Sequence, residues 1–255
     1  MALPDPTFPP LLSGHRIEAG KDVFRAACAG ARTGSYGAGD LLWSRGTKDV
    51  AMALVLEPEV PATRTQEMLF LAMVATADAL GAITPPETAL TYEWPVTLRV
   101  NGAAVGGVRF AQSVERDEHD SPLWLVVGIE MRLAPIAGPV EPGDMPDRTS
   151  LVDEGAVDLD RTQVLESLAR HLLTWIHTWD VDGFAPVLQN WLFRADGYGK
   201  RHSVDTPDGV EEGTFLGLDE EGNLLLKRDA QAGGQTVALR LRDHLPPEPM
   251  EVAAR

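Results

Sequence analysis

The sequence predicts an α+β fold in two parts: a mixed β-sheet with helices packed on it over residues 1–197, and a small all-β domain over residues 198–255. Three observations support this division. Helical and strand-like segments are mixed in the first part without the regular alternation of parallel α/β proteins. One helical segment is apolar on nearly all sides, which predicts a buried helix. From about Gly199 onward, only short β-like runs separated by glycine-containing turns occur.

The first part begins with a proline-rich, extended lead-in over residues 1–14, followed by Asp22–Ala31, which has apolar residues at helical spacing. Two short apolar runs, Leu41–Ser44 and Val50–Leu56, predict buried strands. The segment Thr65–Leu80 is the helix that is apolar nearly all round.

A β-hairpin is predicted next. Leu98–Val100 leads into Asn101-Gly102, and Val105–Phe110 returns. Asn-Gly suits a two-residue type I′ turn, because both positions of that turn need positive φ angles. Pro122–Leu133 predicts another strand, and residues 134–149 are rich in Pro, Gly and Asp, which is typical of a loop.

The last helices of the first part have clear boundaries. Asp160, with Gln163 three residues later, predicts a capping box that opens a long helix with an apolar stripe from Val164 to Trp179. A short helix follows around Pro186–Leu192. The strands predicted for the second part are Thr214–Leu218, Leu224–Lys227 and Thr236–Leu241.

Charge and cysteine content exclude several classes of partner. The chain has 22 basic and 38 acidic residues and a formal net charge of −16, so neither nucleic acid nor an anionic membrane surface is an expected partner. A single cysteine, Cys28, rules out a disulfide within the chain. The proline-rich N-terminus has no basic region of a signal peptide, and the longest apolar run, Met68–Ile83, is too short to span a bilayer. We therefore expect a cytoplasmic protein.

Common catalytic motifs do not occur in the sequence. There is no P-loop, and Gly34, Gly37 and Gly39 precede a predicted strand instead of opening a helix, unlike a dinucleotide-binding fingerprint. Neither a His-Glu-x-x-His nor a Cys-x-x-Cys pattern occurs, so no metal site is predicted. Cys28 is interpreted as a small buried hydrophobic residue. These residues alone indicate only an α+β protein.

A longer segment resembles the signature of biotin protein ligases, which has Lys-Trp-Pro-Asn-Asp, a glycine turn and then Lys-x-x-Gly-Ile/Val. The segment here is Trp94-Pro95-Val96-Thr97-Leu98-Arg99-Val100-Asn101-Gly102-Ala103-Ala104-Val105-Gly106-Gly107-Val108. Other stretches resemble the family in the same order: Val50–Pro58, Val126-Val127-Gly128-Ile129, Thr149-Ser150-Leu151, Gly217-Leu218-Asp219 and Gly222-Asn223-Leu224. The sequence is therefore similar to the biotin/lipoate protein ligase family over roughly residues 15–245.

The resemblance implies a ligase-like domain followed by a small SH3-like barrel. In the family, a biotin or lipoate carboxylate reacts with ATP to give an acyl-adenylate and pyrophosphate, and a lysine of a carrier domain then takes the acyl group. Cations and backbone N–H groups stabilise the charge that develops on phosphorus. If the family activity is retained, ATP and biotin or lipoate are expected as ligands, a carrier domain as partner, and a homodimer is plausible.

The sequence departs from the family where the family meets its ligands. The family's catalytic lysine corresponds to Ala104, and most of its Gly-Arg-rich adenylate loop is absent between Trp43 and Asp49. A glycine at which a ligand closely approaches the backbone corresponds to Glu130. The remaining departures are Glu93, Val96-Thr97, Arg132 and Gly20-Lys21-Asp22.

These departures favour a non-ligating binder of a small carboxylic acid or an adenylate-type ligand. The predicted ligand-binding residues are Trp43, Arg45, Trp94, Gly107, Arg109, Glu130 and Arg132. Arg109 and Arg132 could bind an anion or could form an ion network with Glu130. One alternative is an active ligase or acyltransferase in which Lys48 or Arg45 supplies the cation. The other is a non-catalytic partner of a biotin-carrier protein.

Overall fold

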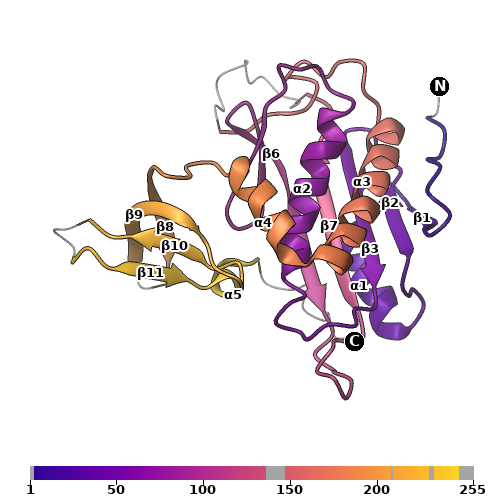
Figure 1. The fold of residues 1–255 in the computed structure, drawn as a ribbon. Helices are drawn as coiled ribbons and strands as arrows, with labels where there is room; N and C mark the ends of the chain where they lie inside the picture. Colours follow the sequence, from indigo (N-terminus) through magenta and orange to yellow (C-terminus); the bar gives the residue numbers. More distant parts are fainter. Residues whose placement is uncertain (1–2, 136–146, 208, 230–232, 247–255) are drawn as a thin grey trace.

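Residues 3–135, 147–207, 209–229 and 233–246 are described by a computed structural model (Figure 1). Within these residues, a seven-stranded sheet forms the centre of the first part, and only β1 and β2 pair in parallel. Its strands in spatial order are β1 (Ser13–Ile17), β2 (Asp40–Ser44), β3 (Asp49–Leu56), β7 (Leu125–Arg132), β6 (Ala103–Gln112), β5 (Thr97–Val100) and β4 (Leu90–Glu93).

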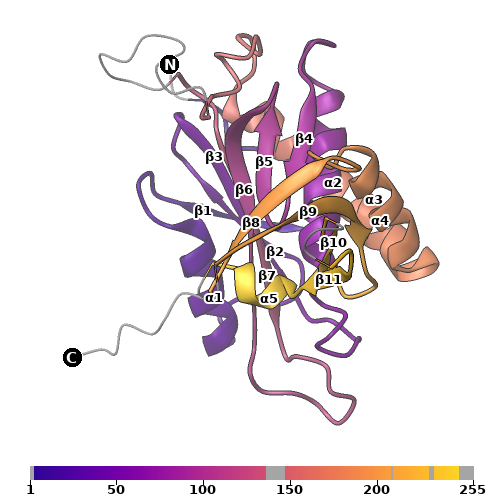
Figure 2. The same ribbon diagram turned by 90° about the vertical axis from the view of Figure 1, so that its left-hand side faces the viewer.

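Helices cover the two faces of this sheet unequally. The helix α1 (Val23–Thr33) lies on one face, and α2 (Glu67–Gly81), α3 (Arg161–Asp182) and α4 (Phe184–Phe193) lie on the other (Figure 2). Each of α1 and α3 begins at an aspartate that accepts a backbone N–H, and Asp160 and Gln163 complete the predicted capping box. The short α1 leaves part of its face of the sheet uncovered.

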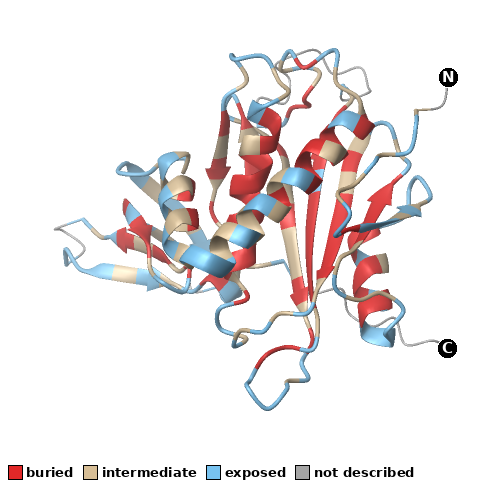
Figure 3. Ribbon diagram, turned by 45° about the vertical axis from the view of Figure 1, so that its right-hand side comes forward, coloured by how far each residue is buried: buried red, intermediate tan, exposed pale blue. Residues whose placement is uncertain are grey.

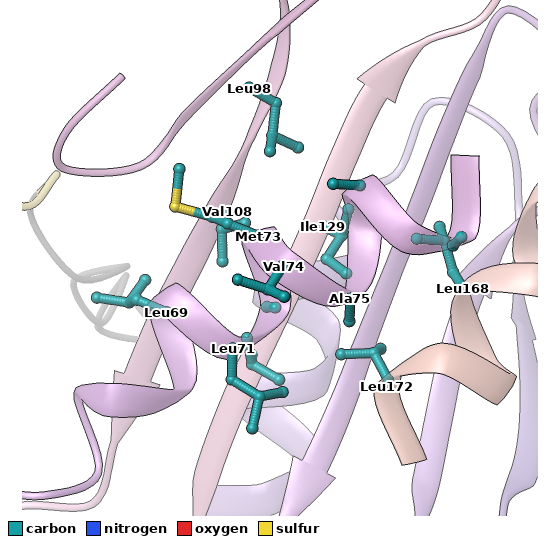
Figure 4. Close-up of a cluster of buried hydrophobic side chains, with 14 of the residues drawn as sticks. Leu69, Leu71, Met73, Val74, Ala75, Leu98, Val108, Ile129, Leu168 and Leu172 are labelled. Carbon is teal, nitrogen blue, oxygen red and sulfur yellow. The ribbon is translucent and has the colours of Figure 1, made fainter. Parts of the chain in front are cut away.

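The helix α2 is the centre of the hydrophobic core. Its residues are buried almost without exception, which confirms the sequence prediction (Figure 3). Side chains of α2 such as Leu71 and Val74 lie between Val108 and Ile129 of the sheet and Leu172 of α3 (Figure 4). Burial of apolar side chains on every side of one helix is the main source of stability in this part.

Side chains on β3 and β7 alternate between the two faces of the sheet. On β7, Ile129 and Met131 are buried in the core under α2, whereas Val126 packs under α1. A Cβ atom on Gly128 would lie 2.6 Å from Cδ2 of Phe24, so α1 packs closely on the glycine. Glu130, two residues further along the same face, lies near the start of α1 and is partly accessible to water.

The predicted hairpin between β5 and β6 is confirmed. Asn101 and Gly102 have φ angles of 49° and 88°, as a type I′ turn requires. On the returning strand, a Cβ atom on Gly106 would lie 2.0 Å from the carbonyl oxygen of Glu130. Glycine at this position therefore permits the close contact between β6 and β7.

The second part is an antiparallel sheet, which confirms the predicted all-β module. Its order is β11 (Thr236–Leu239), β10 (Leu224–Lys227), β9 (Gly209–Leu218) and β8 (Arg201–Thr206), followed by the short helix α5 (Leu241–His244). Its buried side chains, including Phe215 and Leu241, belong to the same hydrophobic cluster as α2. The boundary at residue 197 is a prediction that these contacts do not decide.

Three strands were not predicted, and two predicted strands, Pro122–Leu133 and Thr236–Leu241, were too long. β1, β4 and β8 lie at sheet edges, where half-exposed side chains give little hydrophobic pattern. The predicted strand Thr236–Leu241 ends at Leu239, because Leu241 begins α5 and turns into the core. Of the loop predicted over residues 134–149, residues 136–146 lie outside the described residues.

We expect Gly106→Ala to lower the free energy of unfolding by about 1–3 kcal/mol, because the new methyl group would overpack the strand pair. Gly81→Ala is the matched control: no atom lies within 4 Å of a Cβ there, and alanine favours the helix by about 1 kcal/mol. Urea unfolding followed by tryptophan fluorescence measures both. Equal stabilities for the two variants would contradict the packing argument.

Candidate functional site

A hollow of about 380 Å³ opens on the face of the sheet that α1 leaves partly uncovered. Its floor comes from β3, β6 and β7, and its walls come from residues near Val96, Thr149 and Pro246. The lining residues are Asp49, Val96, Ala104, Val105, Gly106, Gly107, Val108, Arg109, Glu130, Met131, Arg132, Arg148, Thr149 and Pro246. A smaller hollow of about 40 Å³ at the start of α1 shares Arg109 and Glu130 with it.

Four of the seven predicted ligand-binding residues lie together in this hollow. Gly107 and Arg109 come from β6, and Glu130 and Arg132 come from β7. A Cβ atom on Gly107 would lie 2.9 Å from the carbonyl oxygen of Val96, so the glycine keeps the wall close to the floor. The geometry places these four residues at one site, and their contact with a ligand remains a prediction.

The other three residues and Lys48 do not line the hollow. Trp43 is buried on the opposite side of the sheet, with the Arg161 guanidinium 5.0 Å from its ring centroid. The Nη1 atom of Arg45 lies 3.9 Å from the Oε1 atom of Glu18, and the carbonyl oxygen of Arg45 accepts a hydrogen bond from the guanidinium group of Arg161. Lys48 is exposed in the turn between β2 and β3.

Trp94 has a structural position between the two parts of the chain. Its indole Nε1 donates a hydrogen bond of 3.0 Å to the carbonyl oxygen of Gly222, and its ring centroid lies 4.8 Å from that of His244. The peptide bond from Trp94 to Pro95 is cis. The Trp-Pro pair therefore connects the hollow's Val96 wall to the C-terminal sheet.

Arg109 is held in place by α1. Its Nη1 atom donates to both carboxylate oxygens of Asp22, at 2.9 and 3.0 Å, and its guanidinium lies 4.4 Å from the ring centroid of Phe24. Asp22 is also the N-cap of α1 and accepts the N–H of Arg25. Partial burial raises the pKa of Asp22, but the hydrogen bonds from Arg25 and Arg109 outweigh it, and the pKa lies below its ordinary value.

Glu130 has the opposite electrostatic environment. Partial removal from water raises the pKa of this carboxyl group above its ordinary value. The charge of Arg109 opposes the increase, and the charges of Asp22 and Asp49 add to it. No ion pair joins Glu130 to Arg109 or Arg132 within the described residues, so the ion network proposed from the sequence does not form.

Ten lining residues of the hollow were not among the predicted ligand-binding residues, and three of these ten have polar side chains: Asp49, Arg148 and Thr149. Asp49 is the cross-strand partner of Arg132, and a register between the two strands could have identified it. Arg148 and Thr149 are the last residues of the segment 134–149 that was predicted as loop, and they carry no periodic signal. Two backbone hydrogen bonds hold them beside β6: the N–H of Ala104 donates to the carbonyl oxygen of Asp147, and the N–H of Thr149 donates to the carbonyl oxygen of Ala104.

The described residues contain no cluster of three or more His, Cys, Asp or Glu side chains arranged to hold a metal ion. They also contain no helix that is long and apolar enough to cross a membrane. The site thus offers arginines, carboxylates and backbone groups as its binding chemistry.

The fold is that of a protein class with a mixed sheet and a separate small C-terminal sheet. Residues 8–193 match the biotin/lipoate A/B protein ligase family. A biotin–[acetyl-CoA-carboxylase] ligase of Paracoccus denitrificans is 31% identical over 195 residues, which cover 76% of this chain and 80% of that protein. The bifunctional ligase/repressor BirA of Bacillus subtilis is 27% identical over 183 residues, covering 70% of this chain and 53% of its own length.

Solved structures agree with this classification. A biotin protein ligase-like protein of unknown function from Silicibacter sp. TM1040 is 39% identical, with a TM-score of 0.81, covering 94% of this chain and 99% of that one. The biotin protein ligase of Aquifex aeolicus in complex with biotin and ATP has the same fold, with a TM-score of 0.67 at 16% identity, covering 89% of this chain and 94% of that one. The chain belongs to the biotin/lipoate A/B protein ligase family.

We expect Asp22→Asn to lower the free energy of unfolding by about 0.5–1 kcal/mol at pH 7, because asparagine still caps the helix but cannot pair with Arg109. Asp22→Ala removes the cap as well and should lower it by about 1–2 kcal/mol. Because the folded pKa of Asp22 is depressed, the contribution of its charge is present above the unfolded pKa and is lost as the pH falls through the folded value. Urea unfolding between pH 7 and pH 3 tests this, and a constant gap between wild type and Asp22→Asn would contradict it.

For Glu130→Gln we expect a gain in stability at pH 7, because the folded protein holds the ionised carboxylate in an unfavourable environment. The gain should shrink as the pH falls through the raised folded pKa and be absent below the unfolded pKa of about 4.3, where the carboxyl group is protonated in both states. Glu118→Gln is the control, since that side chain is 86% exposed. Thermal unfolding across this pH range would refute the argument if Glu130→Gln were no more stable than the control at pH 7.

Proposed function

We propose that this protein binds a small carboxylic acid, or an adenylate-type derivative of one, in the hollow beside α1 without ligating it to a carrier. The proposal rests on one observation: Ala104 and Glu130 line the same hollow. The resemblance implies a lysine at position 104, and a methyl group can neither donate a hydrogen bond nor neutralise a phosphate. Loss of one such donor typically costs about 3–4 kcal/mol of transition-state stabilisation.

The connection between β2 and β3 supports the same proposal. It consists of residues 45–48, which leaves no room for a loop that folds over an adenylate. Glu130 adds a negative charge where a polyphosphate would have to approach, and its neighbours Asp49 and Asp22 add two more. The arginines of the hollow still offer a binding partner for one anionic group.

An active ligase with rebuilt chemistry is the second candidate, and the similarity to the Paracoccus ligase favours it. In that case an arginine of the hollow would have to stabilise the charge on phosphorus, because Lys48 is exposed and lies outside the lining. This candidate requires ATP-dependent release of pyrophosphate in the presence of an acid substrate.

The test is thermal unfolding against biotin, lipoate, octanoate and ATP, singly and in pairs, with pyrophosphate release measured in parallel. A ligand at 100 times its Kd stabilises the native state by about 2.7 kcal/mol, a shift of several degrees in Tm. We expect a shift with one acid or with its adenylate and no pyrophosphate. Pyrophosphate release would favour the active ligase. If no ligand shifts the Tm but a biotin-carrier domain binds, the protein is an interaction partner instead.

A further inference from the structure

Two arginines of the hollow occupy neighbouring places along one edge of β6. Met131 is the register partner of Gly106, and β7 ends one residue later, at Arg132. Beyond that point the segment 147–149 takes the place of β7 beside β6, with Arg148 paired to Ala104. The N–H of Leu151 donates to the carbonyl oxygen of Arg132, which holds the two segments together at 3.0 Å.

Neither guanidinium group has a partner among the residues that the structure describes. Arg132 lies opposite Asp49 on β3, but no hydrogen bond or ion pair within 4 Å joins their side chains. Arg148 is exposed and also lacks one. Arg109, the third arginine of the hollow, differs because Asp22 already neutralises it. Two like charges at adjacent places on one edge repel each other, and an anion between them would relieve that repulsion.

The space beside them is open at the level of the backbone. Ala104 presents only a methyl group, and Gly106 and Gly107 have no side chain, so at these three lining positions the backbone of β6 is open to the hollow. A guanidinium group donates two parallel hydrogen bonds to a carboxylate or a phosphate, which suits an oxyanion better than any neutral group. Glu130 lies two residues before Arg132 on the same face of β7. Its negative charge repels an anion, so the anion site lies on the Arg132 side of Glu130.

We infer that Arg132 and Arg148 form a clamp for one oxyanion, the carboxylate or phosphate group of the ligand. The inference rests on the proposed function, which it deepens by assigning the anionic end of the ligand to the Arg132 and Arg148 side of the hollow. The clamp replaces, with residues from β7 and from the following segment, a cation that Ala104 cannot supply.

The experiment is calorimetric titration of the full chain with inorganic phosphate, AMP and octanoate, with the arginine Nε–H signals followed by NMR. Arg132→Gln and Arg148→Gln should each weaken binding of the anion roughly ten- to hundredfold, the loss expected for one charge-assisted hydrogen-bonded pair. Arg170→Gln, an exposed arginine on α3, removes the same charge and should leave binding within twofold. Glu130→Gln should tighten binding, since it removes a repulsive charge.

The probes separate the possible sources of the anion. Tight binding of octanoate assigns the clamp to a carboxylate, and tight binding of AMP assigns it to a phosphate ester. If octanoate or AMP binds and both arginine variants bind as well as wild type, the clamp is overturned and the proposed function stands. Binding of phosphate alone, lost in both variants, supports the clamp and overturns the proposed function. Binding of none of the three overturns both.

Discussion

Burial of α2 on every side is the constraint on which the rest of the structure depends. The helix cannot be stable unless the large sheet, α3, α4 and the C-terminal sheet all cover it. Phe70 of α2 contacts both α4 and the C-terminal sheet. Its ring centroid lies 5.4 Å from that of Trp191 on α4, and its Cε2 atom lies 2.3 Å from the place that a Cβ atom on Gly222 would occupy. The side of the central strands under α2 is therefore filled by the core, and the hollow that holds Arg109 and Glu130 opens on the side of α1.

Polar groups of α2 make its packing against α3 specific. Asp78 accepts a hydrogen bond of 2.9 Å from the indole Nε1 of Trp175, and Glu67 accepts one from Trp179 one turn further along α3. Ser167 donates to the carbonyl oxygen of Ala79. Because these buried groups would be unpaired in any other register, they favour one alignment of the two helices. The same core then holds β6 and β7 rigidly under the hollow.

Much of the fold could be predicted from the sequence, because hydrophobic pattern and turn residues reflect local physics. The buried helix α2, the capping box of α3 and the Asn101-Gly102 turn all carried such a signal. The site could be predicted only where the family resemblance and strand alternation agreed, as at Arg109 and Glu130. Arg148 could not be predicted, because its position depends on a return of the chain to the edge of β6. The contact of Trp94 with the C-terminal sheet could not be predicted either, because its indole donates to Gly222, 128 residues further along the chain.

The alternation of side chains on β3 and β7 has a consequence for how the hollow can vary. Every second residue of these two strands belongs to the core under α2, and the residues between them face α1 or, at Asp49, Glu130 and Arg132, the hollow. A replacement at position 130 or 132 therefore changes the charge that lines the hollow and leaves the side chains under α2 as they are. Neighbouring residues of one strand thus belong to two surfaces, of which one can vary in charge while the other keeps its packing.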